Sequence, residues 1–176
     1  VLRENIFSLF LWKAPSFVAP YLPEFISNEY KGIINSKDTK TKLTPYTIEN
    51  KISPCLKNDE KVILIIIDCL RADQWKAMTN ILNKSFRIQT DYQMSILPSA
   101  TFYSRNAIFS GMYPLDLFYS DTDLYMKMLS NPKYYNRFEA ELLRTNLNKS
   151  GFSHINTKYI KVSNYEYGNS LLRTIK

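Results

Sequence analysis

Residues 61–71 read Lys-Val-Ile-Leu-Ile-Ile-Ile-Asp-Cys-Leu-Arg, an unbroken aliphatic run that ends at the carboxylate of Asp68. A run this rich in β-branched side chains predicts a buried parallel strand over residues 62–67. The strand would deliver Asp68 to the carboxyl edge of a sheet, where open α/β sheets bind their ligands. We therefore expect an α/β fold with a ligand site at this edge.

A second stretch places a hydroxyl group at the start of a short helix. Residues 96–111 read Ile-Leu-Pro-Ser-Ala-Thr-Phe-Tyr-Ser-Arg-Asn-Ala-Ile-Phe-Ser-Gly, which predicts a helix over 101–110 that opens on Thr101. Gly111 suits the left-handed conformation that ends helices. An acid after a strand and a hydroxyl at a helix start together suggest a metal-assisted phosphoryl-transfer site.

The composition is that of an ordinary globular chain. Of its 176 residues, 45% are hydrophobic and 22% are charged, which excludes disordered and collagen-like classes. No apolar run approaches the roughly 18–20 residues that a membrane span needs. Cys55 and Cys69 lack CxxC spacing and no secretion signal precedes them, so we expect free thiols and a cytoplasmic location.

The formal charge of +7 favours anionic partners. The lysines are nevertheless spread along the chain, and no basic helix with interleaved aromatic residues indicates a nucleic-acid surface. Charge alone therefore does not select a partner.

Two regions are expected from the change in pattern along the chain. Residues 1–58 carry five prolines and predict the end of a helical module, with helices near 3–12 and 22–34 and an irregular linker over 50–59. Residues 59–176 alternate strands with helices. The chain opens with Val and ends inside a helical pattern, so we expect a fragment of a longer protein.

Within the second region the periodicity predicts the remaining elements. Residues 113–135 are rich in turn residues, which predicts a loop that could act as a lid. The predicted helices lie near 72–83, 101–110, 138–147 and 165–175, and the predicted strands at 86–94 and 157–163.

The chemistry of the site follows from its residue types. A divalent cation would lower the pKa of a hydroxyl and neutralise charge on a phosphate, with Asp68 and Thr101 as its ligands. The exposed amides of the helix start would face the phosphate. Arg105 and Asn106 lie one turn into this helix and could supply further donors, although only one of them needs to point inward.

Structural roles for the same residues stay open from sequence alone. Asp68 could cap the helix that follows it, and Thr101 could cap its own helix. Arg71 and Asp73 could form a solvated helix start.

These stretches resemble a known family. Asp68-Cys-Leu-Arg71 and the run Leu97-Pro-Ser-Ala-Thr-Phe-Tyr-Ser-Arg-Asn-Ala-Ile-Phe-Ser-Gly111 are similar to the PglZ domain of the alkaline phosphatase superfamily, most of all in PorX-type proteins of Bacteroidetes. The similarity continues through Phe138-Glu-Ala-Glu-Leu-Leu and Lys158-Tyr-Ile-Lys-Val-Ser-Asn164 and spans roughly residues 60–176. It implies the N-terminal portion of an alkaline-phosphatase-like sheet with flanking helices, preceded by a short helical segment.

The resemblance also implies a function. It suggests a two-zinc phosphodiesterase acting on oligonucleotides, with Asp68 as a metal ligand and Thr101 as the nucleophile. Proteins of this type carry a receiver domain and act with signalling and secretion-control partners of type IX secretion. Two residues depart from the family pattern: Cys69 stands where the family usually has Asn, and Ser99 where Thr is common. Cys69 could be a soft metal ligand or a small buried residue.

The family's other metal ligands are a later Asp, an Asp-His pair and a further His, which this chain does not contain. Its single histidine, His154, follows Gly151 and is expected to be an exposed turn residue. We therefore expect the 176 residues alone to bind zinc weakly and to hydrolyse nothing.

Two other functions remain as alternatives. One is a non-catalytic nucleotide-binding or scaffold module in two-component signalling, in which a homodimer is possible. The other is a plain nucleotide-binding α/β domain, which the absence of GxGxxG and GxxxxGK[ST] disfavours.

Overall fold

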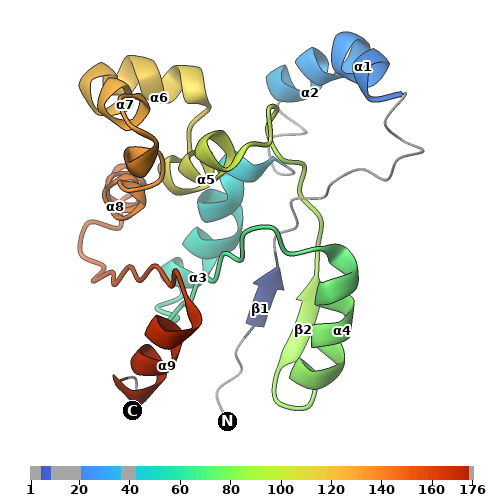
Figure 1. Ribbon diagram of the computed structural model, residues 1–176, viewed down its shortest axis with the longest axis vertical. Helices are drawn as coiled ribbons and strands as arrows, with labels where there is room; N and C mark the ends of the chain where they lie inside the picture. Colours follow the sequence, from blue (N-terminus) through green and yellow to red (C-terminus); the bar gives the residue numbers. More distant parts are fainter. Residues whose placement is uncertain (1–4, 9–20, 37–42, 175–176) are drawn as a thin grey trace.

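The computed structural model describes residues 5–8, 21–36 and 43–174 and is mostly helical (Figure 1). The helices are α1 (Leu22–Phe25), α2 (Lys31–Asn35), α3 (Ser53–Lys57), α4 (Ala72–Leu82), α5 (Thr101–Ser110), α6 (Pro114–Ser120), α7 (Thr122–Leu129), α8 (Glu139–Lys149) and α9 (Tyr165–Thr174). Two short strands lie near α4, whereas α5 lies in the middle of the molecule with α6 and α8 next to it.

The two strands form a parallel pair. β1 (Asn5–Ser8) pairs with β2 (Arg87–Thr90), and Asn5 lies opposite Arg87. The strand expected over 86–94 is thus confirmed in a shorter form. The helix expected near 3–12 is wrong at residues 5–8, and the rest of that range lies outside the described residues.

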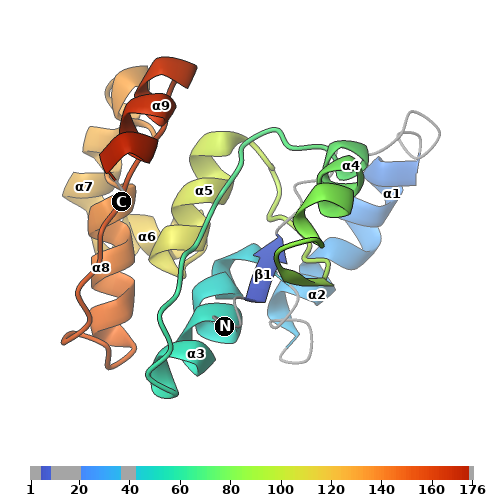
Figure 2. The same ribbon diagram turned by 90° about the horizontal axis from the view of Figure 1, so that it is seen from below.

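The aliphatic run after Lys61 does not form the predicted strand. Residues 61–67 run as a long extended segment from α3 towards α4, and among the described residues no other segment pairs with them (Figure 2). Their side chains alternate: Leu64 and Ile66 pack against the core, whereas Ile63 is 80% and Ile65 68% exposed. The prediction of a buried strand was wrong because one face of the segment is left uncovered.

Residues 157–163 are also not a strand in the structure. Tyr159 from this segment packs against the core, but its backbone has no strand partner among the described residues. In the described residues, the sheet with flanking helices expected from sequence is therefore represented only by the β1–β2 pair. Both segments have the alternating pattern of a strand, but no described segment pairs with them as a sheet requires.

Helices with a clear apolar period are confirmed. α4, α5, α8 and α9 match the expected ranges closely, and the range 22–34 is occupied by α1, a π-helical turn at Ile26–Tyr30 and α2. Gly111 ends α5 with φ +70°, and Gly151 follows α8 with φ +86°. Both glycines adopt the left-handed conformation, which other residues adopt only with strain.

Two segments expected to be irregular are helical instead. Residues 50–59 include α3 and part of a π-helical turn at Ile48–Ile52, and the region 113–135 contains α6 and α7. Residues that resemble turn formers act here as helix starts. Pro114 is the first residue of α6, and the Asp121 carboxylate accepts a hydrogen bond of 2.9 Å from the Leu124 amide at the start of α7.

Two hydrophobic clusters in the core of the described residues meet at α8 and at Leu64 of the extended segment. α5 lies at the centre of the larger one (Figure 1). The larger cluster contains the buried residues Phe102, Phe109, Leu117, Met128 and Leu142, and the smaller one contains Ile48, Leu147 and Phe152. Ile48 of the first predicted region thus packs against Leu147 and Phe152 of the second. The expected division of the chain between residues 58 and 59 stays a prediction.

None of the described helices is both long enough and apolar enough to cross a membrane.

Candidate functional site

Asp68 lies in a turn between the extended segment 61–67 and α4. Its side chain is 35% exposed. α4 is capped by Arg71, whose exposed guanidinium pairs with Asp73 at 2.5 Å, so the capping role considered for Asp68 is wrong and the solvated helix start is confirmed. Asp68 is therefore available for another role.

Cys69 shares this turn. Its φ is +58°, a left-handed conformation that is unusual for a residue with a side chain. The thiol is exposed and donates to the Asp68 carboxylate at 3.8 Å. The interpretation of Cys69 as a small buried residue is therefore wrong.

Thr101 is the first residue of α5, and Ala100 is the N-cap. The cap interpretation of Thr101 is therefore wrong as well. The amides of Tyr103 and Ser104 donate to Ala100 O, whereas within the described ranges the amides of Thr101 and Phe102 and the Thr101 hydroxyl make no hydrogen bond. Unpaired donors at a helix start attract anions.

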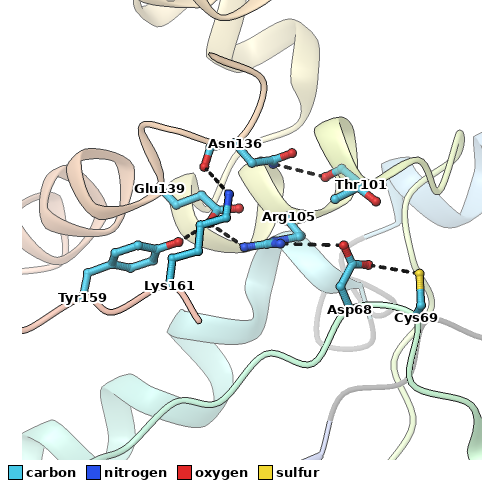
Figure 3. Close-up of polar contacts among 8 residues, drawn as sticks. All are labelled: Asp68, Cys69, Thr101, Arg105, Asn136, Glu139, Tyr159 and Lys161. Carbon is cyan, nitrogen blue, oxygen red and sulfur yellow. Dashed lines mark hydrogen bonds and ion pairs between the residues drawn. The ribbon is translucent and has the colours of Figure 1, made fainter. Parts of the chain in front are cut away.

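Arg105 faces one of the two candidate residues, Asp68 (Figure 3). Its Nη1 lies 3.7 Å from the Asp68 carboxylate, and its side chain is 15% exposed. Thr101 lies one helical turn before Arg105 on α5, and in the close-up its backbone oxygen is joined to Asn136. The structure thus brings Asp68 and Arg105 together, whereas a contact of the Thr101 hydroxyl with either of them stays a prediction.

Asn106, the fourth expected residue, is buried at 3% exposure. Its Nδ2 donates to Tyr135 O at 2.8 Å, which ties α5 to the turn that precedes α8. This contact occupies the Nδ2 end of the amide group. A catalytic role for Asn106 stays a prediction.

Further polar residues surround Arg105 that were not expected from the sequence. Glu139, the first residue of α8, accepts a hydrogen bond of 2.6 Å from Arg105 Nη2, and Tyr159 Oη donates to the same carboxylate oxygen (Figure 3). Asn136 Nδ2 donates to Thr101 O at 3.3 Å, and Lys161 Nζ donates to Asn136 O at 3.3 Å.

One signal for Glu139 was present in the sequence. Glu139 lies three and four residues before Leu142 and Leu143, on the apolar face of its helix. A carboxylate at such a position must find a partner, since an unpaired buried charge is strongly destabilising. Pattern alone, however, does not say which cation supplies the pairing.

The electrostatics of Tyr159 follow from this contact. Burial, together with the hydrogen bond to Glu139 and the charge of that carboxylate, raises the pKa of Tyr159 above its ordinary value. The phenol therefore stays protonated at neutral pH and remains a donor.

The residues present do not by themselves complete a zinc site. Asp68 and Thr101 offer two oxygen donors, but within the described part of the chain no group of three or more His, Cys, Asp or Glu side chains is placed to hold a metal ion. Zinc sites in proteins usually take three or four protein ligands. His154 lies exposed in a turn, and its ring is tilted by 46° against that of Phe152, with centroids 6.5 Å apart.

Comparison with known proteins gives one family match. The model described as "BREX system PglZ alkaline phosphatase-like domain" matches residues 47–175, well over half of the chain. It begins before the boundary expected at residue 59 and includes the π-helical turn at Ile48–Ile52 and α3. No curated protein matches the chain significantly.

Proposed function

This chain belongs to the PglZ alkaline phosphatase-like domain family, and from that premise we propose that it carries part of a phosphodiesterase site centred on Thr101. The observation that carries the proposal is the start of α5. There a hydroxyl and two amides make no hydrogen bond in the described structure, and Arg105, one turn further along the same helix, pairs with Asp68. Membership of this family supports phosphoryl chemistry as the reaction class. The role proposed for each residue is argued from its side-chain chemistry and position.

In the proposed reaction Thr101 Oγ1 attacks phosphorus, and the bond from phosphorus to the oxygen of the leaving group breaks. That oxygen takes up the proton lost by Thr101 and departs as the alcohol, and water then hydrolyses the phosphoester on Thr101 and returns a proton to Oγ1. Arg105 and the free amides of α5 stabilise the charge on the phosphate oxygens. Asp68 is the proposed metal ligand, and the remaining ligands come from groups other than those described.

We propose zinc as the cofactor, with two ions, as the resemblance to the family implies. When bound, zinc would lower the pKa of a hydroxyl and offset the negative charge of the phosphate. Because the described residues do not complete its site, we predict that the 176-residue chain alone binds zinc weakly and has no hydrolase activity. Equilibrium dialysis against zinc and an assay with a chromogenic phosphodiester test this. Tight binding or turnover by the chain alone would contradict the prediction.

The finer parts of the proposal rest on the resemblance of residues 97–111. They are an oligonucleotide or another phosphodiester as substrate, and signalling and secretion-control partners of the PorX type. A cytoplasmic location is proposed separately, from the two thiols without CxxC spacing. The competing function is a module that binds nucleotide without cleaving it. The lack of a complete metal-binding group in the described residues favours that alternative, and the hydrolysis assay discriminates between the two.

The assay uses the full-length natural protein rather than the 176-residue chain alone, with zinc and a chromogenic phosphodiester. Thr101→Ala should lower kcat at least about 10³-fold because the nucleophile is lost, whereas Thr101→Ser keeps a hydroxyl and should retain measurable turnover. Ser99→Ala is the matched control, since Ser99 is an exposed hydroxyl two residues before Thr101. Full activity in Thr101→Ala would refute the assignment of the nucleophile.

A further inference from the structure

Glu139 is a fully buried carboxylate at the first position of α8. Burial of a charged carboxylate is costly unless the charge is paired and hydrogen-bonded. Its Oε2 accepts hydrogen bonds from Arg105 Nη2 and Tyr159 Oη. Three segments, α5, α8 and residues 157–163, therefore meet at one oxygen atom.

The contact with Glu139 sets the direction of the Arg105 guanidinium. This group is planar, and its N–H donors have a fixed fork geometry. Because Nη2 is held at 2.6 Å by Glu139, the Nη1 edge is turned towards Asp68. The Nη1 distance of 3.7 Å to Asp68 is too long for a hydrogen bond, so this edge can still donate to another acceptor.

Tyr159 restricts the carboxylate in turn. Its phenol donates to Glu139, and its ring packs edge-on against Phe109, with ring centroids 5.8 Å apart. The ring is thus fixed by the core at one end and by the carboxylate at the other. A buried ion pair is often no more stabilising than a hydrophobic pair of similar volume. Stability alone is therefore a weak reason for a charged group at this place.

We propose, on the basis of the function proposed above, that Glu139 and Tyr159 are positioning residues for Arg105. They hold the guanidinium so that its Nη1 edge faces a phosphate oxygen of a substrate bound between Asp68 and the start of α5. Arg105 touches the substrate, whereas Glu139 and Tyr159 act through Arg105.

The first test measures binding of inorganic phosphate to the 176-residue chain by calorimetry. Arg105→Gln should weaken binding at least about tenfold, because a charge-assisted hydrogen bond is lost. Glu139→Gln and Tyr159→Phe should each weaken it severalfold. Glu141→Gln, an exposed position on the same helix, is the matched control and should leave the affinity unchanged.

A double-mutant cycle separates positioning from a general effect on the fold. When Arg105 is already replaced by Gln, Tyr159→Phe should have no further effect on phosphate affinity, since the group it positions is gone. A second readout is rotation of the Arg105 guanidinium, followed by ¹⁵N NMR, which should become faster in Glu139→Gln and Tyr159→Phe. Tyr159→Phe keeps the test decisive if Glu139→Gln fails to fold.

The possible failures are distinguishable. If the wild-type chain does not bind phosphate, or Arg105→Gln binds it as wild type does, this inference is overturned, whereas the proposed function is refuted by full hydrolysis in Thr101→Ala. If Arg105→Gln weakens binding but Tyr159→Phe and folded Glu139→Gln do not, only the positioning role is overturned. Unchanged guanidinium rotation in both variants would overturn it as well.

Discussion

Arg105 is the residue on which the candidate site converges. One edge of its guanidinium is bonded to the buried Glu139, and the other edge faces Asp68. The positions of Asp68 after an aliphatic run and of Thr101 at the first residue of a helix could be predicted from local sequence patterns, whereas their roles in a site stay predictions. Glu139 and Tyr159 could not, because their roles depend on contacts over 34 and 20 residues of sequence.

The raised pKa of Tyr159 gives a prediction about stability at high pH. In the unfolded chain a tyrosine ionises near pH 10, while in the folded protein Tyr159 keeps its proton to higher pH. The unfolded state then binds fewer protons, so the contribution of Tyr159 to stability is complete below about pH 10 and declines above it.

Denaturant unfolding between pH 8 and 11 measures this effect. Tyr159→Phe should show a smaller loss of stability over that range than the wild type. The control is Tyr165→Phe at an exposed position, which should follow the wild-type profile. The same pH profile for wild type and Tyr159→Phe would contradict the prediction.

α5 is the element that positions the site. Its start carries Thr101 and its second turn carries Arg105, while its buried face forms the centre of the larger cluster. The helix and its end at Gly111 could be predicted from periodicity and from a glycine stop. The helical nature of 113–135 could not, since Pro114 and Asp121 are equally typical of turns.

Gly111 should be the glycine most sensitive to substitution in the described chain. At φ +70° any side chain is strained, and an added Cβ would lie 2.9 Å from Asn146 Nδ2, the atom that joins α8 to Phe109 O of α5. We expect Gly111→Ala to lower the free energy of unfolding by about 2–3 kcal/mol.

Gly151→Ala is the matched control. Its φ of +86° is also left-handed, but a Cβ there meets open space. Strain alone should cost about 1 kcal/mol. Denaturant unfolding of both variants checks the comparison, and equal losses would show that the contact of α5 with α8 is not sensitive to this position.

The extended segment 61–67 links the two hydrophobic clusters. Leu64 packs against both of them, while Ile63 and Ile65 point outward. The alternation of side chains could be predicted from a β-type sequence, but pairing could not, since a strand exists only where another segment satisfies its backbone. The expected sheet failed for this reason at 62–67 and again at 157–163.

Leu64 should therefore matter more to stability than its neighbours. Leu64→Ala removes apolar contacts with both clusters and should cost about 1–3 kcal/mol, the lower range because the side chain is only partly buried. Ile65→Ala at an exposed position should stay within about 0.5 kcal/mol of wild type. Thermal and denaturant unfolding measure both, and equal effects would contradict the assignment of Leu64 to the core.

The most direct test of the proposed chemistry uses the full-length natural protein. It is quenched with acid during turnover of a phosphodiester and then analysed by mass spectrometry. The account predicts a substrate-derived phosphoester on the peptide that contains Thr101, and its absence in Thr101→Ala. A phosphoester on another residue, or turnover without any adduct in a variant that lacks this hydroxyl, would contradict it.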